Sequence, residues 1–117
     1  MSTMRENSIR NLLGKTGWDN LNGSNEVEVN SAKIRGNGEF VLDCLQGGLH
    51  WTVHLTPTTG NELRGEFTTK EEGSYRGSIS ARLFTYKDEL FLFGTWKQDN
   101  YDYHWWAHLY EVEPDEG

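Results

Sequence analysis

The sequence ELFLFGTWKQDNYDYHWWAHLYEV, residues 89–112, decides the fold of this chain. Its side chains alternate as they would on extended strands, but both faces carry large apolar groups. One face of its first half would present Leu90 and Leu92, and the other face Phe91 and Phe93. A half-exposed strand needs only one apolar face. The second face must therefore meet a ligand, another subunit or a covering segment of the same chain.

The same extended pattern runs through most of the chain. From Gly17 onward, short extended segments are separated by turn residues at intervals of about ten to fourteen positions, which is typical of all-β folds. No segment between them is long enough for a parallel crossover helix, so we expect neighbours in sequence to pair as antiparallel hairpins. The sequence predicts eight strands, over residues 17–21, 26–31, 38–45, 49–56, 62–69, 74–85, 90–98 and 103–112.

A repeat of glycine followed two residues later by an apolar residue predicts how this sheet closes. It occurs at Gly38/Phe40, Gly65/Phe67, Gly77/Ile79 and Gly94/Trp96. Glycine within a strand usually marks a sharp bend or a close approach of a neighbouring group. We therefore predict an all-β, eight-stranded antiparallel up-and-down barrel. Its interior should hold Leu63, Phe67, Ile79, Leu83, Leu92 and Trp96.

The chain of 117 residues is long enough for one domain with its own core. Residues 1–16 are interpreted as a leader or a short helix, because Ile9, Leu12 and Leu13 have helical spacing and Gly14 is a stop signal. Residues 17–112 form the predicted barrel. Residues 113–117 are predicted to form an acidic tail.

Composition argues against several classes of partner. The net charge is -7 and no cluster of Lys or Arg offsets it, so we expect no nucleic-acid binding. Neither a signal peptide nor a membrane span is visible, which predicts a cytoplasmic protein without membrane contact. Cys44 is the single cysteine, so no intrachain disulfide can form. It shares the phase of Phe40 and Leu42 and should be a buried, unreactive thiol.

No motif for catalysis or for a cofactor stands out. The pairs His50/His54 and His104/His108 have a spacing that binds zinc on a helix, but on a strand the partners would lie about 13 Å apart. Nucleophile motifs such as GxSxG are absent from the sequence. We therefore expect a protein that is not an enzyme, with no catalytic residues, no metal site and no cofactor.

The tryptophans suggest a binding site. Five tryptophans are many for a chain of this length, and each carries an N–H that needs a partner when buried. Large rings in a small barrel can line a cavity or cap its mouth. We expect Trp18, Trp51, Trp96 and Trp105 to wall an interior site for a small, largely apolar ligand.

The segment Trp18-Asp19-Asn20-Leu21-Asn22-Gly23-Ser24 resembles the opening hairpin of the avidin and streptavidin family, whose pattern is Trp-x-Asn-x-x-Gly-Ser. The resemblance implies a calycin-type up-and-down barrel, as in avidins and lipocalins. It also implies that Asn20 and Ser24 are polar anchors of an interior ligand, which in that family is biotin. Cys44 and Gln46 stand where the family has a tyrosine and a small hydroxyl residue.

A second hypothesis places the function on the outside of the barrel. The interior could instead be filled by side chains, and the chain would then be an interaction or oligomerisation module. An aromatic belt on consecutive strands is typical of a homodimer or docking face. The belt would consist of Phe84, Phe91, Phe93, Trp106 and Tyr110, and the partner would be a second copy in a homodimer or larger homo-oligomer.

Overall fold

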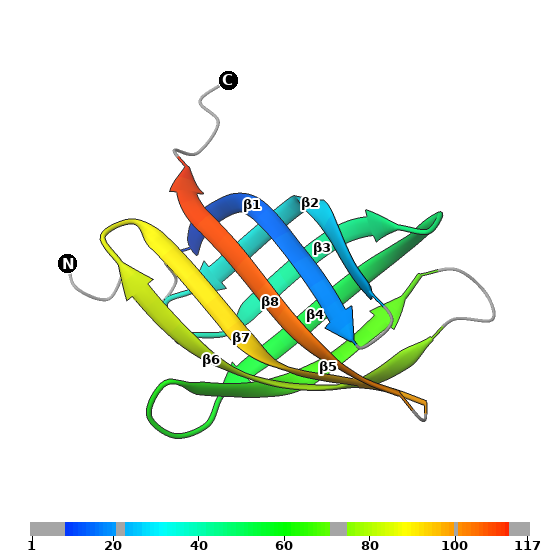
Figure 1. The fold of residues 1–117 in the computed structure, drawn as a ribbon. Coiled ribbons are helices and arrows are strands. Elements are labelled where there is room, and N and C mark those ends of the chain that lie inside the picture. The colour runs from blue at the N-terminus through cyan, green and yellow to red at the C-terminus, as the bar shows by residue number, and fades with distance from the viewer. Residues whose placement is uncertain (1–8, 21–22, 71–74, 100, 113–117) are drawn as a thin grey trace.

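The computed structural model describes residues 9–20, 23–70, 75–99 and 101–112, which form a closed antiparallel barrel. Each strand pairs with its neighbours in sequence, and β1 pairs with β8 to close the sheet (Figure 1). The predicted all-β up-and-down barrel is confirmed. The strands are β1 (Ile9–Asn20), β2 (Gly23–Arg35), β3 (Phe40–Gln46), β4 (Leu49–Pro57), β5 (Glu62–Thr69), β6 (Arg76–Tyr86), β7 (Glu89–Gln98) and β8 (Tyr101–Val112).

The first strand differs most from the expectation. β1 begins at Ile9, so residues 9–14 are extended rather than helical; residues 1–8 lie outside the described part of the chain. The helical spacing was misleading because β1 has a register shift between Leu12 and Lys15, which interrupts the two-residue alternation. Leu12 is buried at 1% exposure, whereas Leu13 points outward. Pairing with both β2 and β8 outweighs the local preference for a helix.

Three of the four repeat glycines lie within strands where no side chain would fit. A Cβ atom at Gly65 would lie 1.9 Å from the carbonyl oxygen of His54, and one at Gly94 would lie 1.9 Å from that of Ser80. At Gly77 it would meet the backbone of β7 and the ring of Phe67. The strands can approach this closely only without a Cβ atom, as the close-approach interpretation predicts. The fourth glycine, Gly38, lies instead in the turn before β3.

Two tight turns have the backbone geometry of two-residue hairpins. Gly47 and Gly48 join β3 to β4 with Gln46 paired to Leu49, and both glycines have positive φ angles, of 64° and 80°. A two-residue hairpin of this type requires positive φ at both positions. Lys87 begins the equivalent connection from β6 to β7 with a φ of 58°.

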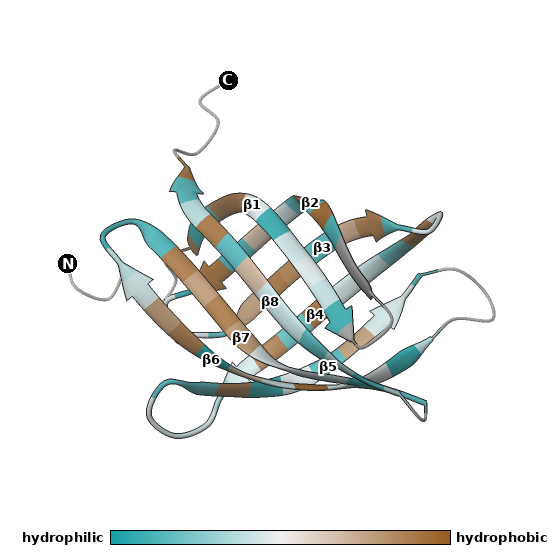
Figure 2. Cartoon of the chain, in the orientation of Figure 1, coloured by the Kyte–Doolittle hydropathy of each residue, from teal (hydrophilic) through white to brown (hydrophobic). Residues whose placement is uncertain are grey.

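The interior of the barrel is packed with alternate side chains of all eight strands. Figure 2 shows brown and teal residues alternating along several strands, whereas much of β7 is brown, as expected for a strand with two apolar faces. Of the predicted interior residues, Leu83 is partly buried and packs against the core. The others are at most 3% exposed: Leu63, Phe67, Ile79, Leu92 and Trp96.

The two ends of the barrel differ. One end carries the turns from β2 to β3, from β4 to β5 and from β6 to β7, and it is filled by apolar side chains such as Leu12, Phe40, Leu55, Leu90 and Leu109. The other end carries the four remaining connections and most of the tryptophans. None of the described segments forms a helix long and apolar enough to cross a membrane.

Cys44 lies in the core, as the sequence predicted. The residue is 1% exposed. Burial, together with the neighbouring Asp43 carboxylate, raises the pKa of its thiol to about 12. The thiol is therefore protonated at neutral pH, and a protonated, buried thiol is a poor nucleophile.

Candidate functional site

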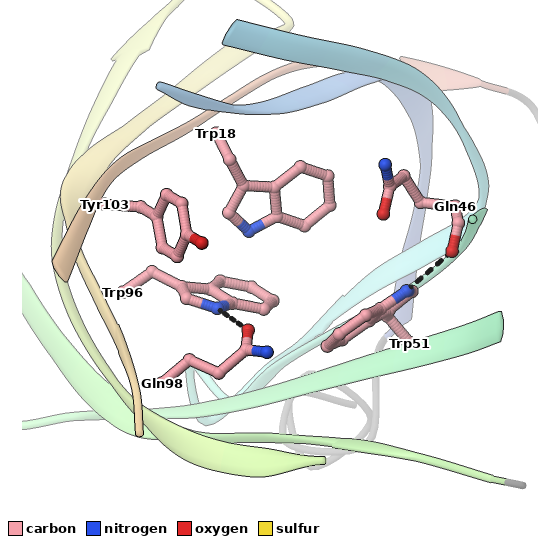
Figure 3. Close-up of a pocket in the computed structure, with 6 residues that line it drawn as sticks. All are labelled: Trp18, Gln46, Trp51, Trp96, Gln98 and Tyr103. Carbon is pink, nitrogen blue, oxygen red and sulfur yellow. Dashed lines mark hydrogen bonds between the residues drawn. The ribbon is translucent and has the colours of Figure 1, made fainter. Parts of the chain in front are cut away.

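A cavity of about 150 Å³ opens at the end of the barrel that carries the β3–β4 and β7–β8 turns. Side chains from five strands line it (Figure 3). They are Trp18 of β1, Gln46 of β3, Trp51 of β4, Trp96 and Gln98 of β7, and Tyr103 of β8. The barrel is thus solidly packed at one end and hollow at the other.

The walls of the cavity are aromatic rings that support one another. Trp96 stands at the centre, with the ring of Trp18 edge-on to it at a centroid distance of 5.0 Å and Trp51 at 5.9 Å. Phe67 stacks on Trp96 at 4.0 Å, and Tyr75 stacks on Trp51 at 5.9 Å. Rings held from several sides have little freedom to turn, so the walls of the cavity are preformed.

Two of the three tryptophan N–H groups in the wall have acceptors within the protein. Trp51 Nε1 donates to the backbone carbonyl of Gln46 at 3.0 Å. Trp96 Nε1 donates to Oε1 of Gln98 at 3.1 Å. Both bonds are drawn as dashed lines in Figure 3. The third, Trp18 Nε1, is buried and has no acceptor among the described residues.

The part of the cavity lining that the structure describes carries no charged side chain. The six described side chains that line it are four aromatic rings and two amides, and none of them belongs to Asp, Glu, His, Lys or Arg. A charged ligand would therefore leave water without meeting an opposite charge in the wall, which is costly. The geometry favours a neutral ligand with a flat apolar part.

Three of the residues predicted to line the ligand site do line the cavity, and Trp105 does not. Trp18, Trp51 and Trp96 line the cavity as predicted. Trp105 is buried in the core at 1% exposure and packs against Trp96 at 6.2 Å, but it does not line the cavity. The backbones of Asn20 and Ser24 lie in the β1–β2 hairpin. Their side chains lie outside the described part of the structure, so their role as anchors stays a prediction.

Three polar residues of the site were missed by the sequence analysis. Gln46, Gln98 and Tyr103 each lie two residues from a buried side chain of the same strand, namely Cys44, Trp96 and Trp105. Two-residue alternation alone therefore places them on the inward face at the strand ends. The alternation could therefore have identified these three residues. Polar residues are also common at strand ends simply because turns follow there, so the pattern alone did not single them out.

The structure places the five residues of the predicted outer belt on three neighbouring strands. Phe84, Phe91, Phe93, Trp106 and Tyr110, here called the outer aromatic face, lie on β6, β7 and β8 and point away from the core. Phe84 pairs with Phe91, and Phe93 pairs with Trp106. Phe84, Phe93 and Tyr110 are 47%, 54% and 47% exposed, whereas Phe91 and Trp106 are half-buried.

The histidines lie on the outside of strands β4 and β8. His54 contacts Glu39 at 3.2 Å, and His108 contacts Glu89 at 2.8 Å while stacking on Phe91. Within the described ranges, no three His, Cys, Asp or Glu side chains gather closely enough to hold a metal ion.

Comparison of the chain with protein-family models, with curated proteins and with solved structures finds no match in any of the three. Fold and cavity together define the class as a closed up-and-down β-barrel with an aromatic-walled mouth. The function must be inferred from the site, because one fold can carry many functions.

Proposed function

We propose that this barrel binds a small, neutral, largely apolar ring molecule in the cavity at its open end. The observation that supports the proposal is the lining itself: Trp18, Trp51, Trp96 and Tyr103 surround a space whose lining, among the described residues, includes no charged side chain. Apolar walls with a few polar groups are the usual composition of small-molecule sites. The amides of Gln46 and Gln98 supply these polar groups.

The size of the cavity limits the ligand. At about 150 Å³ it lies below the range of drug-sized pockets, which begins at about 300 Å³. An engineered apolar cavity of about 150 Å³ in another protein holds one benzene molecule. We therefore expect one flat ring inside, with any further part of the ligand projecting through the mouth. Affinity for a ring alone should be modest, with a Kd of roughly 0.1–1 mM.

The first prediction concerns binding of single rings. The ring probes are toluene and 2-pyridone, and biotin is included because residues 18–24 resemble the avidin motif. Each compound is titrated into the protein, and the tryptophan Nε1–H signals are followed by NMR. We expect at least one of the ring probes to shift the signals of Trp18, Trp51 and Trp96 in a saturable way, because these rings line the cavity. Tyr103→Trp places a larger ring in the cavity and should weaken binding about tenfold or more.

The matched control is Tyr86→Trp, at the opposite end of the barrel, where the side chain is 63% exposed. This variant should bind like the parent. The proposal is wrong if neither ring probe gives a saturable shift, or if Tyr103→Trp binds as tightly as Tyr86→Trp.

A second candidate function is self-association through the outer aromatic face. Exposed Phe84 and Phe93 form a ridge whose ring centroids lie 6.3 Å apart. Beside it, a hollow of about 390 Å³ is lined by Gly14, Trp106, Tyr110 and their neighbours on β1, β2 and β8. A two-fold axis along the β7–β8 boundary would set the ridge of each copy against the hollow of the other. The occupant we propose is therefore a second copy of this chain.

The second prediction is that Phe93→Ser shifts a dimer toward the monomer. Light scattering at micromolar concentration should show the parent as a dimer and the variant with at least tenfold weaker association, because exposed aromatic anchors dominate such interfaces. Tyr101→Ser is the matched control, since Tyr101 is 63% exposed but lies outside the outer aromatic face. A monomeric parent across the concentration range rejects the interface.

A further inference from the structure

The indole N–H of Trp18 is the least explained polar group of the cavity. Trp18 is 7% exposed, and its Nε1 has no hydrogen-bond partner among the described residues. A buried donor without an acceptor is destabilising, so native proteins rarely leave one. In Figure 3 the nitrogen lies on the edge of the ring that faces the cavity, between the side chains of Tyr103 and Trp96.

Gln98 presents a second donor to the same space. Its Oε1 accepts the N–H of Trp96 at 3.1 Å. An indole nitrogen can only donate, so the amide must turn its oxygen toward Trp96 and its NH₂ group away from it. Figure 3 shows this nitrogen on the side of the cavity that faces Trp51. The orientation of the Gln98 amide is thus fixed by a neighbouring wall residue.

The hydrogen-bond donors and acceptors of the cavity wall indicate which polar group a ligand would need. Trp51 and Trp96 have their acceptors inside the protein, whereas Trp18 Nε1 and the Gln98 NH₂ group have no acceptor among the described residues. The Gln46 amide and the Tyr103 hydroxyl, which also line the cavity, can each donate or accept. A ligand that fits this cavity would therefore supply an oxygen or nitrogen lone pair. A carboxylate would bring a charge into a wall whose described residues include no cation. A neutral carbonyl oxygen meets both conditions.

We propose that the ligand of this cavity is a flat, neutral ring with a carbonyl-type oxygen that accepts the N–H of Trp18, with the Gln98 NH₂ group as a second donor. The proposal rests on the proposed small-molecule function and specifies the ligand class. Of the probes above, 2-pyridone belongs to this class, and toluene has a similar size and shape without an acceptor.

The experiment compares the affinity ratio of 2-pyridone to toluene in three proteins: the parent, Trp18→Phe and Trp105→Phe. Trp18→Phe keeps an aromatic wall but removes the donor, so the ratio should fall about tenfold relative to the parent. Trp105→Phe is the matched control. It deletes the other unpartnered indole N–H, which is buried but does not line the cavity, so it should leave the ratio unchanged.

A measurement on the parent protein complements the variants and does not depend on their folding. In ¹⁵N-labelled protein, 2-pyridone should move the Trp18 Nε1–H proton downfield, because the proton then enters a hydrogen bond. Toluene should leave it without such a shift.

The outcomes separate the two proposals. If both probes bind but the ratio is the same in the parent and Trp18→Phe, and the Trp18 proton shifts alike with each probe, the acceptor proposal is overturned while small-molecule binding stands. Such a result would mean that water satisfies Trp18. If neither probe binds, the proposed function fails, and the ligand class fails with it.

Discussion

Gly94→Ala should destabilise the barrel by at least about 3 kcal/mol, the upper end of the usual cost of overpacking. The added Cβ atom would lie 1.9 Å from the carbonyl oxygen of Ser80 and 2.5 Å from the Cα atom of Ala81. Both atoms are backbone atoms of the paired strand β6, so no side-chain rotation can relieve the contact. Relief requires β6 and β7 to separate, which breaks their pairing in a closed sheet. The Tm should fall by more than about 10 °C in a thermal scan.

Gly47→Ala is the matched control for this prediction. Gly47 has a φ of 64°, but an added Cβ atom would meet nothing within 4 Å. The cost there is only the left-handed backbone of a non-glycine residue, about 1 kcal/mol. If Gly94→Ala were no more destabilising than Gly47→Ala, the strands would have room to adjust, and close approach would not explain the in-strand glycines.

These glycines show why the fold was predictable from the sequence. Alternation assigned the inward faces of β5, β6 and β7 correctly, and it did so with residues such as Phe67, Ile79 and Trp96 that are nearly fully buried. Gly65, Gly77 and Gly94 then indicated a tightly coiled sheet, which the short backbone contacts explain. Local pattern and global fold agree in this part of the chain, which makes prediction reliable.

The first strand was not predictable in the same way. The register shift between Leu12 and Lys15 breaks the two-residue period, and what remains looks helical. β1 is extended because it closes the barrel against β2 and β8, and that pairing is formed with residues far away in the sequence. The residue pattern within β1 alone carries no information about the distant strands with which β1 pairs.

The candidate site was predictable in its walls but not in its polar groups. Counting tryptophans in phase identified Trp18, Trp51 and Trp96. The same reasoning wrongly placed Trp105 in the cavity wall. The alternation of a strand shows which face a ring occupies, but it does not show how far the ring lies from the open end of the barrel. The pairing of Trp96 with Gln98 and the orphaned N–H of Trp18 depend on distances between side chains. Only the three-dimensional arrangement supplies these.

Trp96→Ala is expected to cost about 3–5 kcal/mol, the range for removing a large buried aromatic side chain. Trp96 is 1% exposed and is in contact with Phe67, Trp18, Trp51 and Trp105. Its loss would leave a void beside the existing cavity and would remove the partner of Gln98 Oε1. Because stability is typically only about 5–15 kcal/mol, urea unfolding should show a greatly lowered midpoint or a protein already unfolded in buffer.

Trp106→Ala is the matched comparison, since it removes the same side chain from the outside of the neighbouring strand. Trp106 is half-buried and lies outside the barrel core, so its loss should cost clearly less than the loss of Trp96. Trp96→Phe should lie between the two, because it keeps a ring in the stack but loses the bond to Gln98. Equal midpoints for Trp96→Ala and Trp106→Ala would mean that the aromatic cluster does not organise the barrel. The preformed walls inferred for the cavity would then lose their physical basis, because no rigid central ring would hold Trp18 and Trp51 in place.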